Sequence, residues 1–316
     1  MAQVLVTGAT GFVGKRLCQM LGAAGFDVKA CVRHQQEDFP FPQILIPSID
    51  QTTDWQDALE EVDYVIHCAA RVHVMQDSVS DPLSEYRKVN VEGTKTLLEA
   101  SQKAGVKRFI FLSSIKVNGE DTENRPAFKS DDVINADALD PYGLSKFEAE
   151  EVVKGLCHAE DRLSYTIIRP PLVYGEGVKA NFAQLIRLSQ KKLPVPFGCL
   201  KNKRSLVYRD NLCDLIITCL DHENARNETF LASDDRDLPV RDLYKTLCHL
   251  QQKKALMVFV APFFLRLLGK LLGRTAQVKR LCQPLCVDIQ KTKERLNWIP
   301  PVDIYSGLFQ TLKGRQ

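Results

Sequence analysis

The chain has 316 residues, 45% of them hydrophobic and 26% charged, which is the composition of a soluble globular protein with one large or two closely joined domains. Its net charge of +3 gives no basis for nucleic-acid binding. The ten cysteines include no C-x-x-C pair, which favours buried free thiols over a disulfide framework or a metal site. Because the sequence starts directly in an apolar strand with no signal peptide, we expect a cytoplasmic protein.

The first element is a short apolar strand, Val4–Val6, followed by a glycine turn and an amphipathic helix that begins near Lys15. This order predicts a phosphate cradle, because glycines let backbone N–H groups approach a pyrophosphate and a helix N-terminus favours its negative charge. A P-loop is excluded, since Gly14-Lys15 is followed by Arg16 and not by serine or threonine. We therefore expect a dinucleotide cofactor to contact Gly8, Thr10, Gly11, Phe12, Val13 and Gly14.

The residue after the second strand indicates which dinucleotide binds. That strand is predicted at Val28–Val32, and Arg33 follows it directly. An acidic residue at this point would bind the adenosine ribose hydroxyls of NAD, whereas a cation suits the 2′-phosphate of NADP. The sequence therefore favours NADP(H). NAD(H) stays open, because Arg33 could instead lie over the face of the adenine ring.

The next elements supply further candidate cofactor contacts. A third strand, 44–46, leads to Asp50 and to a helix over 54–59, and a fourth strand, 64–70, ends in the small residues Ala69 and Ala70. Small side chains at the carboxyl end of a strand leave room for a ligand. One helix is predicted over 86–104, with Asn90 beside its apolar stripe. We expect Asp50, Ala69, Ala70 and Asn90 to contact the cofactor, although Asn90 could also be a surface amide.

The chemistry is expected where a fifth strand, 108–112, and the following helix meet. The strand ends at Ser113-Ser114, and Asp140-Pro141 opens a helix that carries Tyr142 and Lys146 on one face. A free tyrosine has a pKa near 10, and we expect the Lys146 ammonium to lower it. Tyr142 could then exchange a proton with a substrate oxygen that Ser114 holds by a hydrogen bond. These three residues are the candidate catalytic groups.

The alternation of strands and helices predicts an α/β fold, a Rossmann-type doubly wound parallel sheet with a smaller C-terminal lobe. A sixth strand over 165–168 leads to Arg169-Pro170 and a turn ending at Gly175. We assign residues 1–175 to the nucleotide-binding domain, with a return of the chain around 206–230, and 176–316 mainly to a substrate-binding lobe. The apolar stretch 255–272 is too interrupted to span a bilayer and is predicted as a buried strand and helix, with peripheral membrane contact through its basic flanks as the alternative.

Several motifs resemble the extended short-chain dehydrogenase/reductases, the NAD(P)-dependent epimerases, dehydratases and reductases of sugar nucleotides. The resemblance covers nearly the whole chain, in the G-x-x-G-x-x-G turn, Asn90-Val-Glu-Gly-Thr94, Ser113-Ser114, Tyr142-x-x-x-Lys146 and Arg169-Pro-Pro-Leu-Val-Tyr-Gly175. It implies that Tyr142 is the acid/base, that Lys146 binds the nicotinamide ribose, that Ser114 positions the sugar hydroxyl, and that Pro170 lines the cofactor.

Residues 70–75 and 113–120 are similar to a bacterial polysaccharide-biosynthesis subgroup, which includes UDP-glucose and UDP-N-acetylglucosamine 4-epimerases and UDP-N-acetylquinovosamine or fucosamine 4-keto reductases. The resemblance implies a UDP-sugar substrate, with His73, Asn181, Phe182 and Arg204 among its contacts, and often a homodimer through helices 86–104 and 145–155. Arg204 could instead be a solvated member of the basic run 201–204.

The sequence also departs from the UDP-galactose 4-epimerases. It has Arg33 in place of an acidic residue, Pro171-Leu172 in place of an asparagine turn, and Lys116 in place of a small residue. We therefore expect reduction of a UDP-4-keto-6-deoxy-N-acetylhexosamine, with 4-epimerisation as the alternative within the family. A non-catalytic redox sensor is the alternative of another class, although it would not need Ser114, Tyr142 and Lys146 together.

Overall fold

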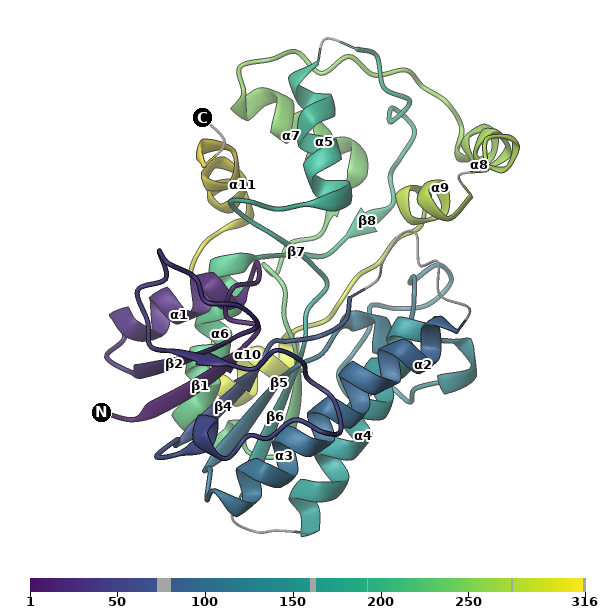
Figure 1. The fold of residues 1–316 in the computed structure, drawn as a ribbon. Coiled ribbons are helices and arrows are strands. Elements are labelled where there is room, and N and C mark those ends of the chain that lie inside the picture. The colour runs from purple at the N-terminus through teal and green to yellow at the C-terminus, as the bar shows by residue number, and fades with distance from the viewer. Residues whose placement is uncertain (73–80, 160–162, 192, 274, 315–316) are drawn as a thin grey trace.

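The computed structural model describes residues 1–72, 81–159, 163–191, 193–273 and 275–314 (Figure 1). Its centre is a seven-stranded sheet in the order β10-β6-β5-β4-β1-β2-β3, in which every neighbouring pair is parallel. The strands are β1 Gln3–Thr7, β2 Asp27–Val32, β3 Gln43–Leu45, β4 Tyr64–His67, β5 Arg108–Leu112, β6 Ser164–Arg169 and β10 Glu228–Leu231. This confirms the predicted Rossmann-type sheet.

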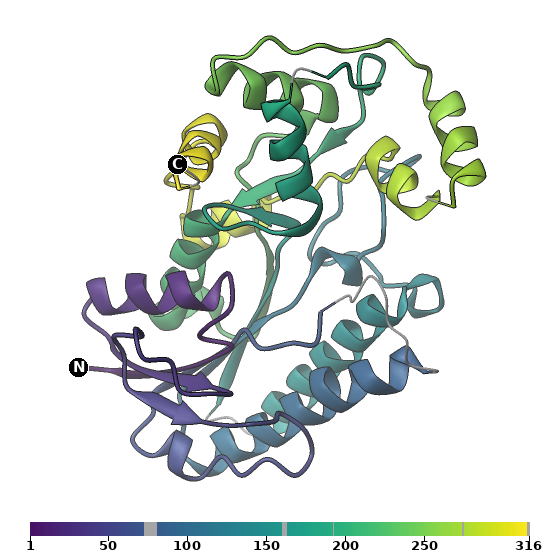
Figure 2. The ribbon, with the colours of Figure 1, turned by 45° about the horizontal axis from the view of Figure 1, so that its top comes forward.

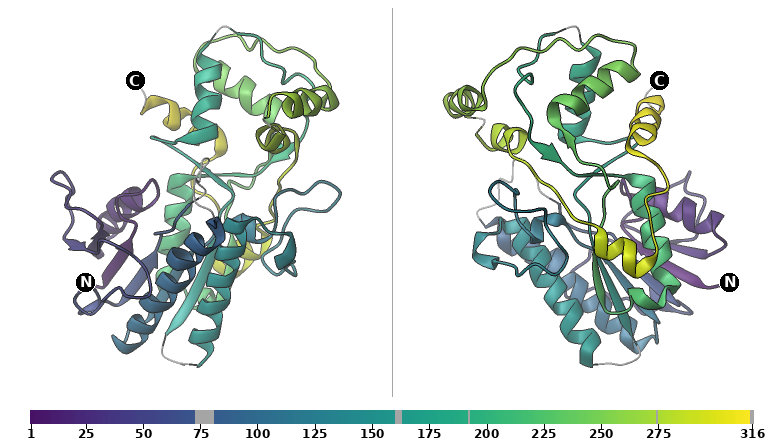
Figure 3. Two further views of the ribbon diagram at one scale, coloured as in Figure 1. Left: turned by 45° about the vertical axis from the view of Figure 1, so that its right-hand side comes forward. Right: turned by 180° about the vertical axis from the view of Figure 1, so that it is seen from behind.

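Helices cover both faces of the sheet, as Figure 3 shows from two further sides. α1 (Gly14–Ala23), α6 (Arg209–Asp221) and α10 (Gln290–Leu296) pack on one face, and α3 (Gly93–Lys103) and α4 (Pro141–Ala159) pack on the other. Alternation along a strand explains how one strand serves both layers: Val4 and Val6 of β1 pack in the first core, whereas Leu5 packs in the second. The central strands β1, β4, β5 and β6 are buried along most of their length, as parallel sheets with two covered faces require.

The chain leaves the sheet after β6, builds part of a smaller lobe, and then returns. β7 (Leu172–Tyr174) pairs with β9 (Leu206–Tyr208), α6 packs on α1, and β10 joins the sheet beside β6. The smaller lobe contains α5 (Ala180–Gln190), β8 (Lys203–Arg204), β11 (Leu238–Pro239), α7 (Val240–Leu250), α8 (Pro262–Leu271), α9 (Thr275–Cys282) and α11 (Ile304–Lys313) (Figure 2).

Several local predictions need correction. The single helix expected over 86–104 is α2 (Pro82–Arg87), a π-helical turn over Lys88–Glu92, and α3, and the helix expected over 54–59 is a short 3₁₀ turn at Asp57–Leu59. The fourth strand ends at His67, three residues before the predicted end.

The prediction of a buried strand and helix over 255–272 is wrong. Residues 255–261 contribute one isolated bridge, Met257 to Val195, and the helix α8 leaves most of its apolar side chains exposed. Periodicity showed an apolar helix, but which other element would cover it depends on the tertiary fold.

Candidate active site

The glycine turn packs so closely on itself and on the segment after β4 that it has no room for side chains at Gly8 and Gly14. Gly8 has φ +66°, and a β-carbon there would lie 2.9 Å from the Ala69 nitrogen. A β-carbon at Gly14 would lie 2.2 Å from the Gly8 carbonyl oxygen. The turn is closed by Gly11 N–H, which donates to Gly8 O at 2.9 Å.

The helix that follows the turn is suited to an anion. No side chain caps the N-terminus of α1, and its first turn has no acidic residue. Thr10 and Gly11 are exposed, and Phe12 and Val13 are partly so. Exposed backbone at an uncapped helix N-terminus fits the pyrophosphate of a dinucleotide.

Hydrogen bonds from the end of β4 hold the glycine turn in place. The His67 side chain lies between two hydroxyls, with Nδ1 2.7 Å from Thr7 Oγ1 and Nε2 3.1 Å from Thr94 Oγ1. Burial lowers the pKa of His67 to about 3, so the imidazole is neutral. Ala69 N–H donates to Thr7 Oγ1 at 3.2 Å, which fixes the start of the segment after β4 beside the glycine turn. Sequence reasoning did not identify His67, because a histidine inside an apolar strand carries no motif.

Asn90 holds this segment against helix α4. Its Oδ1 accepts from Arg71 N–H at 2.8 Å, and its Nδ2 donates to Arg71 O and to Ser145 Oγ at 3.1 and 3.0 Å. The side chain is 1% exposed, so the surface-amide alternative is wrong. Since both amide hydrogens already have protein acceptors, Asn90 positions the segment that carries Ala69 and Ala70. Both alanines are partly exposed.

Ser114 and Tyr142 come together from β5 and α4. Ser114 follows the carboxyl end of β5 in an extended conformation, and its Oγ accepts from Lys116 N–H at 3.3 Å. Tyr142 is the second residue of α4, and its ring meets the ring of Tyr86 edge-on at 5.8 Å. The side chain of Ser114 lies close enough to Tyr142 to lower the pKa of its hydroxyl slightly, which favours the phenolate. The two groups can therefore act on the same substrate oxygen.

Burial raises the pKa of Tyr142 to about 12, and the Asp140 carboxylate contributes in the same direction, against the smaller effect of Ser114. This is opposite to the predicted lowering by Lys146, which is not among the groups that shift this pKa. At neutral pH the Tyr142 hydroxyl keeps its proton and is a proton donor.

Lys146 is directed at β5 and not at the tyrosine hydroxyl. Its Nζ donates to Leu112 O at 2.8 Å and lies 3.9 Å from the centre of the Phe111 ring. The side chain is 1% exposed, and burial lowers the pKa of Lys146 to about 7, although the Glu150 carboxylate acts in the opposite direction. The ammonium group is thus held one turn from Tyr142 at the carboxyl end of β5, close to its protonation midpoint at neutral pH.

An ion-paired cluster borders the Tyr142 end of α4. Lys116 Nζ pairs with Glu120 at 2.5 Å and also with Asp140. Asp140 in turn accepts from Gly143 N–H at 2.7 Å and so caps α4. Burial raises the pKa of Asp140, but the hydrogen bonds from Lys116 and Gly143 outweigh it and hold the pKa below its usual value. Asp140 therefore stays ionised two residues from Tyr142.

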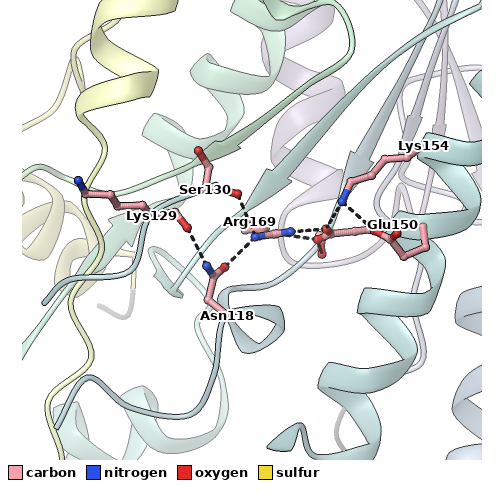
Figure 4. Close-up of polar contacts among 8 residues, drawn as sticks. Asn118, Lys129, Ser130, Glu150, Lys154 and Arg169 are labelled. Atoms are coloured by element: carbon pink, nitrogen blue, oxygen red, sulfur yellow. Dashed lines mark hydrogen bonds and ion pairs between the residues drawn. The ribbon is translucent and has the colours of Figure 1, made fainter. Parts of the chain in front are cut away.

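A buried network around Glu150 and Arg169 fixes α4 to β6 and to Ser113 at the end of β5 (Figure 4). Glu150 accepts from Ser113 Oγ at 2.5 Å and from Arg169 Nε and Nη2 at 2.8 and 2.5 Å. Arg169 Nη1 donates to Asn118 Oδ1 at 3.0 Å, and Asn118 Nδ2 donates to Lys129 O at 2.8 Å. The network therefore sets the position of the strand ends that carry Ser114 and Pro170.

The remaining predicted cofactor contacts lie at the carboxyl ends of the strands. Arg33 follows β2 and is exposed, whereas Pro170 follows β6, is buried, and accepts from Ile115 N–H at 3.0 Å through its carbonyl. Asp50, after β3, accepts from Thr52 N–H and Oγ1 at 2.9 and 2.6 Å, and these bonds lower the pKa of Asp50. Its cofactor contact stays a prediction.

The smaller lobe carries the predicted substrate contacts. Asn181 is exposed near the start of α5, whereas Phe182 is buried and stacks on Tyr174 at 5.4 Å. Arg204 is partly buried, and its Nη1 donates to Arg280 O and Gln283 O at 2.8 and 3.0 Å. The alternative that Arg204 is a solvated cation is therefore wrong. His73 lies outside the described residues.

A family model described as the NAD dependent epimerase/dehydratase family matches residues 4–232. The chain belongs to this family. It is 44% identical over 310 residues to a UDP-glucose 4-epimerase of Vibrio cholerae, which covers 98% of this chain and 94% of that relative. It is 31% identical over 327 residues to the N-acetyl-α-D-glucosaminyl-diphospho-ditrans,octacis-undecaprenol 4-epimerase of Escherichia coli O157:H7, again covering 98% and 94%.

Solved structures of epimerases share the fold. UDP-glucuronic acid 4-epimerase from Bacillus cereus in complex with NAD matches with a TM-score of 0.77 at 23% identity, covering 99% of this chain and 98% of that one. UDP-glucose 4-epimerase from Thermotoga maritima with UDP-glucose matches with a TM-score of 0.75 at 23% identity and the same coverage. The family's two-part architecture, a Rossmann sheet with a smaller lobe, therefore extends along the whole chain.

Proposed function

We propose that the protein reduces the 4-keto group of a UDP-linked 6-deoxy-N-acetylhexosamine with NADPH. The observation that carries this proposal is the exposed cation Arg33 after β2, which suits the 2′-phosphate of an NADPH that a reductase must exchange at each turnover. The Ser114–Tyr142 pair at the carboxyl end of β5 supplies the acid. A protonated tyrosine is the form that reduction of a carbonyl needs, because the C4 oxygen must gain a proton as it becomes an alcohol.

Each residue of the pair has a separate task. When bound, the nicotinamide cofactor supplies a hydride to the substrate carbon or removes one from it. Ser114 Oγ donates a hydrogen bond to the C4 oxygen and holds it beside the Tyr142 hydroxyl. Tyr142 Oη gives its proton to that oxygen as negative charge develops there. Lys146, whose Nζ is held at Leu112 O at the carboxyl end of β5, is placed to donate to the nicotinamide ribose of the bound cofactor.

The second candidate is 4-epimerisation without net redox change. It is supported by the two relatives described above, both named as 4-epimerases of a hexose that carries a diphosphate. The same Ser114–Tyr142 pair serves both reactions, because epimerisation removes and then returns a hydride at C4. The two reactions differ in whether cofactor is consumed.

We also propose NADP(H) as the cofactor, because the exposed cation Arg33 follows β2 where a carboxylate would contact the ribose of NAD. For the substrate, we propose that the diphosphate of the UDP-sugar lies against Arg204, with Asn181 and Phe182 near the nucleotide. A partly buried guanidinium held by two carbonyls is a fixed donor for phosphate oxygens.

One experiment separates the candidates. The purified protein is incubated with UDP-4-keto-6-deoxy-N-acetylglucosamine, UDP-N-acetylglucosamine or UDP-glucose, each with NADPH or NADH. We expect loss of the reduced-nicotinamide absorbance only with the keto sugar, and faster with NADPH. Interconversion of C4 epimers with no net cofactor loss would replace the reductase by the epimerase.

The cofactor assignment is tested with Arg33→Asp and the exposed control Lys103→Asp. Arg33→Asp should weaken the binding of NADPH more than the binding of NADH, whereas Lys103→Asp should leave both unchanged. Equal weakening of NADPH and NADH binding by Arg33→Asp would refute the assignment of Arg33 to the 2′-phosphate.

A further inference from the structure

Exposed apolar side chains are concentrated in one segment of the smaller lobe. Of the eighteen large hydrophobic side chains exposed among the described residues, nine fall between 256 and 272. We call them the α8 surface: Leu256, Val258, Phe259, Phe263, Phe264, Leu267, Leu268, Leu271 and Leu272. Exposed apolar residues scattered singly are ordinary, whereas a concentration of this kind marks an interaction site.

Helix α8 divides into faces. Leu265 and Gly269 are buried, and a β-carbon at Gly269 would lie 2.7 Å from Val278, so this side packs closely on α9. Phe263, Leu267 and Leu271 recur at helical spacing on the opposite side and are 69, 47 and 75% exposed. The helix is thus anchored by one stripe and presents the other outward, at the edge of the lobe (Figures 1 and 2).

The segment of the chain that carries this surface has charges of one sign. Residues 243–287 contain eight lysines and arginines and no aspartate or glutamate. The whole chain has a net charge of +3, so the remaining residues together carry −5. On α8 itself, Arg266 and Lys270 are exposed one turn apart along the border of the apolar stripe; Glu123, from the loop before α4, faces Arg266 at 3.1 Å and offsets part of its charge.

We propose that the α8 surface docks the protein onto an anionic phospholipid bilayer as a peripheral, non-spanning contact. Among the described residues, no helix is both long enough and apolar enough to cross a membrane. An apolar stripe bordered by cations is instead the pattern of a helix that lies in the plane of the headgroups. The cations are attracted by acidic lipid, and the phenylalanines and leucines enter the acyl boundary.

Docking would also orient the proposed active site. α9, on which α8 packs, ends at Cys282, and Arg204 donates to the carbonyls of Arg280 and Gln283 at that end. Gln283 and Arg266 both contact Glu123, in the segment that follows Ser114. The bilayer contact would therefore hold the part of the smaller lobe that carries Arg204 close to the membrane surface.

The test uses the full-length protein and co-sedimentation with vesicles. We expect binding to phosphatidylglycerol-containing vesicles at low salt, weaker binding at high salt, and little binding to pure phosphatidylcholine. Phe263→Ser combined with Phe264→Ser should weaken binding by roughly tenfold or more, since each loss of 1.4 kcal/mol is a factor of ten. Lys270→Glu should weaken it by about tenfold.

Matched controls distinguish binding through the α8 surface from non-specific binding to vesicles. Ile299→Ser removes an apolar side chain that is 69% exposed, like Phe263, and Lys103→Glu reverses an exposed cation elsewhere; both should bind as the wild type does. Thermal unfolding checks that each variant is folded. Phe263→Trp gives a second readout, because the tryptophan fluorescence should shift to the blue on anionic vesicles. This variant keeps a large apolar side chain at position 263, so it should bind as the wild type does.

Three outcomes would overturn the proposal. The first is absence of binding to anionic vesicles by the wild type together with no shift for Phe263→Trp. The second is equal loss of binding in the α8 variants and their controls. The third is a change of oligomeric mass, measured by light scattering, in the Phe263/Phe264 variant without vesicle binding by the wild type, which would assign the surface to a second copy of the chain.

Discussion

Replacing Glu150 with glutamine should destabilise the protein strongly, although the side chain keeps its shape. The carboxylate is fully buried, and it compensates the charge of Arg169, which is 2% exposed. Removing one partner of a buried ion pair leaves an uncompensated charge and costs about 3–5 kcal/mol. Unfolding entropy scales to about 0.7 kcal/mol per kelvin for 316 residues, so the melting temperature should fall by about 4–7 °C.

The assay is thermal and urea unfolding of Glu150→Gln, Arg169→Gln and the double variant. Because the double variant removes both charges, its cost should be well below the sum of the single costs. Lys154→Ala is the control: Lys154 lies 3.8 Å from the same carboxylate but is 30% exposed, so its loss should cost less than about 1 kcal/mol. A cost under about 1 kcal/mol for Glu150→Gln, or strict additivity with Arg169→Gln, would refute the reasoning.

Three further predictions concern the site. Tyr142→Phe should lower kcat by about 10²- to 10⁴-fold and leave the Kd for NADPH within about twofold; a variant with normal kcat would contradict the acid role. Lys146 has its pKa lowered to about 7 in the folded protein, so the unfolded chain binds the extra proton between pH 7 and 10. The unfolding free energy of the wild type relative to Lys146→Met should therefore rise with pH in that window, by up to about 1.4 kcal/mol per pH unit, and a flat difference in urea titrations would count against it. Gly14→Ala, whose β-carbon would meet the Gly8 carbonyl, should raise the Kd for cofactor by about tenfold or more, whereas Gly155→Ala, which meets nothing within 4 Å in α4, should bind cofactor normally.

The order of elements could be predicted because each depends on local pattern. Short apolar runs, glycine turns and amphipathic helices at regular intervals specify strands and crossovers, and right-handed connections then fix a parallel sheet. The same reasoning located Ser114, Tyr142 and Lys146, since each follows the carboxyl end of a strand or begins the next helix. Parallel strands bring those ends to one edge, so neighbours along the chain become neighbours in space.

The electrostatics of the site depended on packing. The pKa of Tyr142 is raised because its partly buried hydroxyl loses water and lies near the Asp140 carboxylate, and Lys146 bonds to Leu112 O in place of acting on the tyrosine. Neither the direction of the Tyr142 pKa shift nor the hydrogen-bond partner of Lys146 can be predicted from a spacing of four residues. Asn90 likewise has the position of a surface amide in the sequence, and only the approach of Ser145 from α4 buries it.

The sequence by itself therefore determined the sheet, the phosphate cradle and the candidate catalytic residues, since these follow from nearest-neighbour pattern and strand order. The tertiary structure decided which side chains lose water and which charges meet. It pairs Glu150 with Arg169, and it leaves the outer stripe of α8 facing solvent. Burial is a property of contacts between distant segments, and an apolar helix has the same periodicity whether another element covers it or a bilayer does.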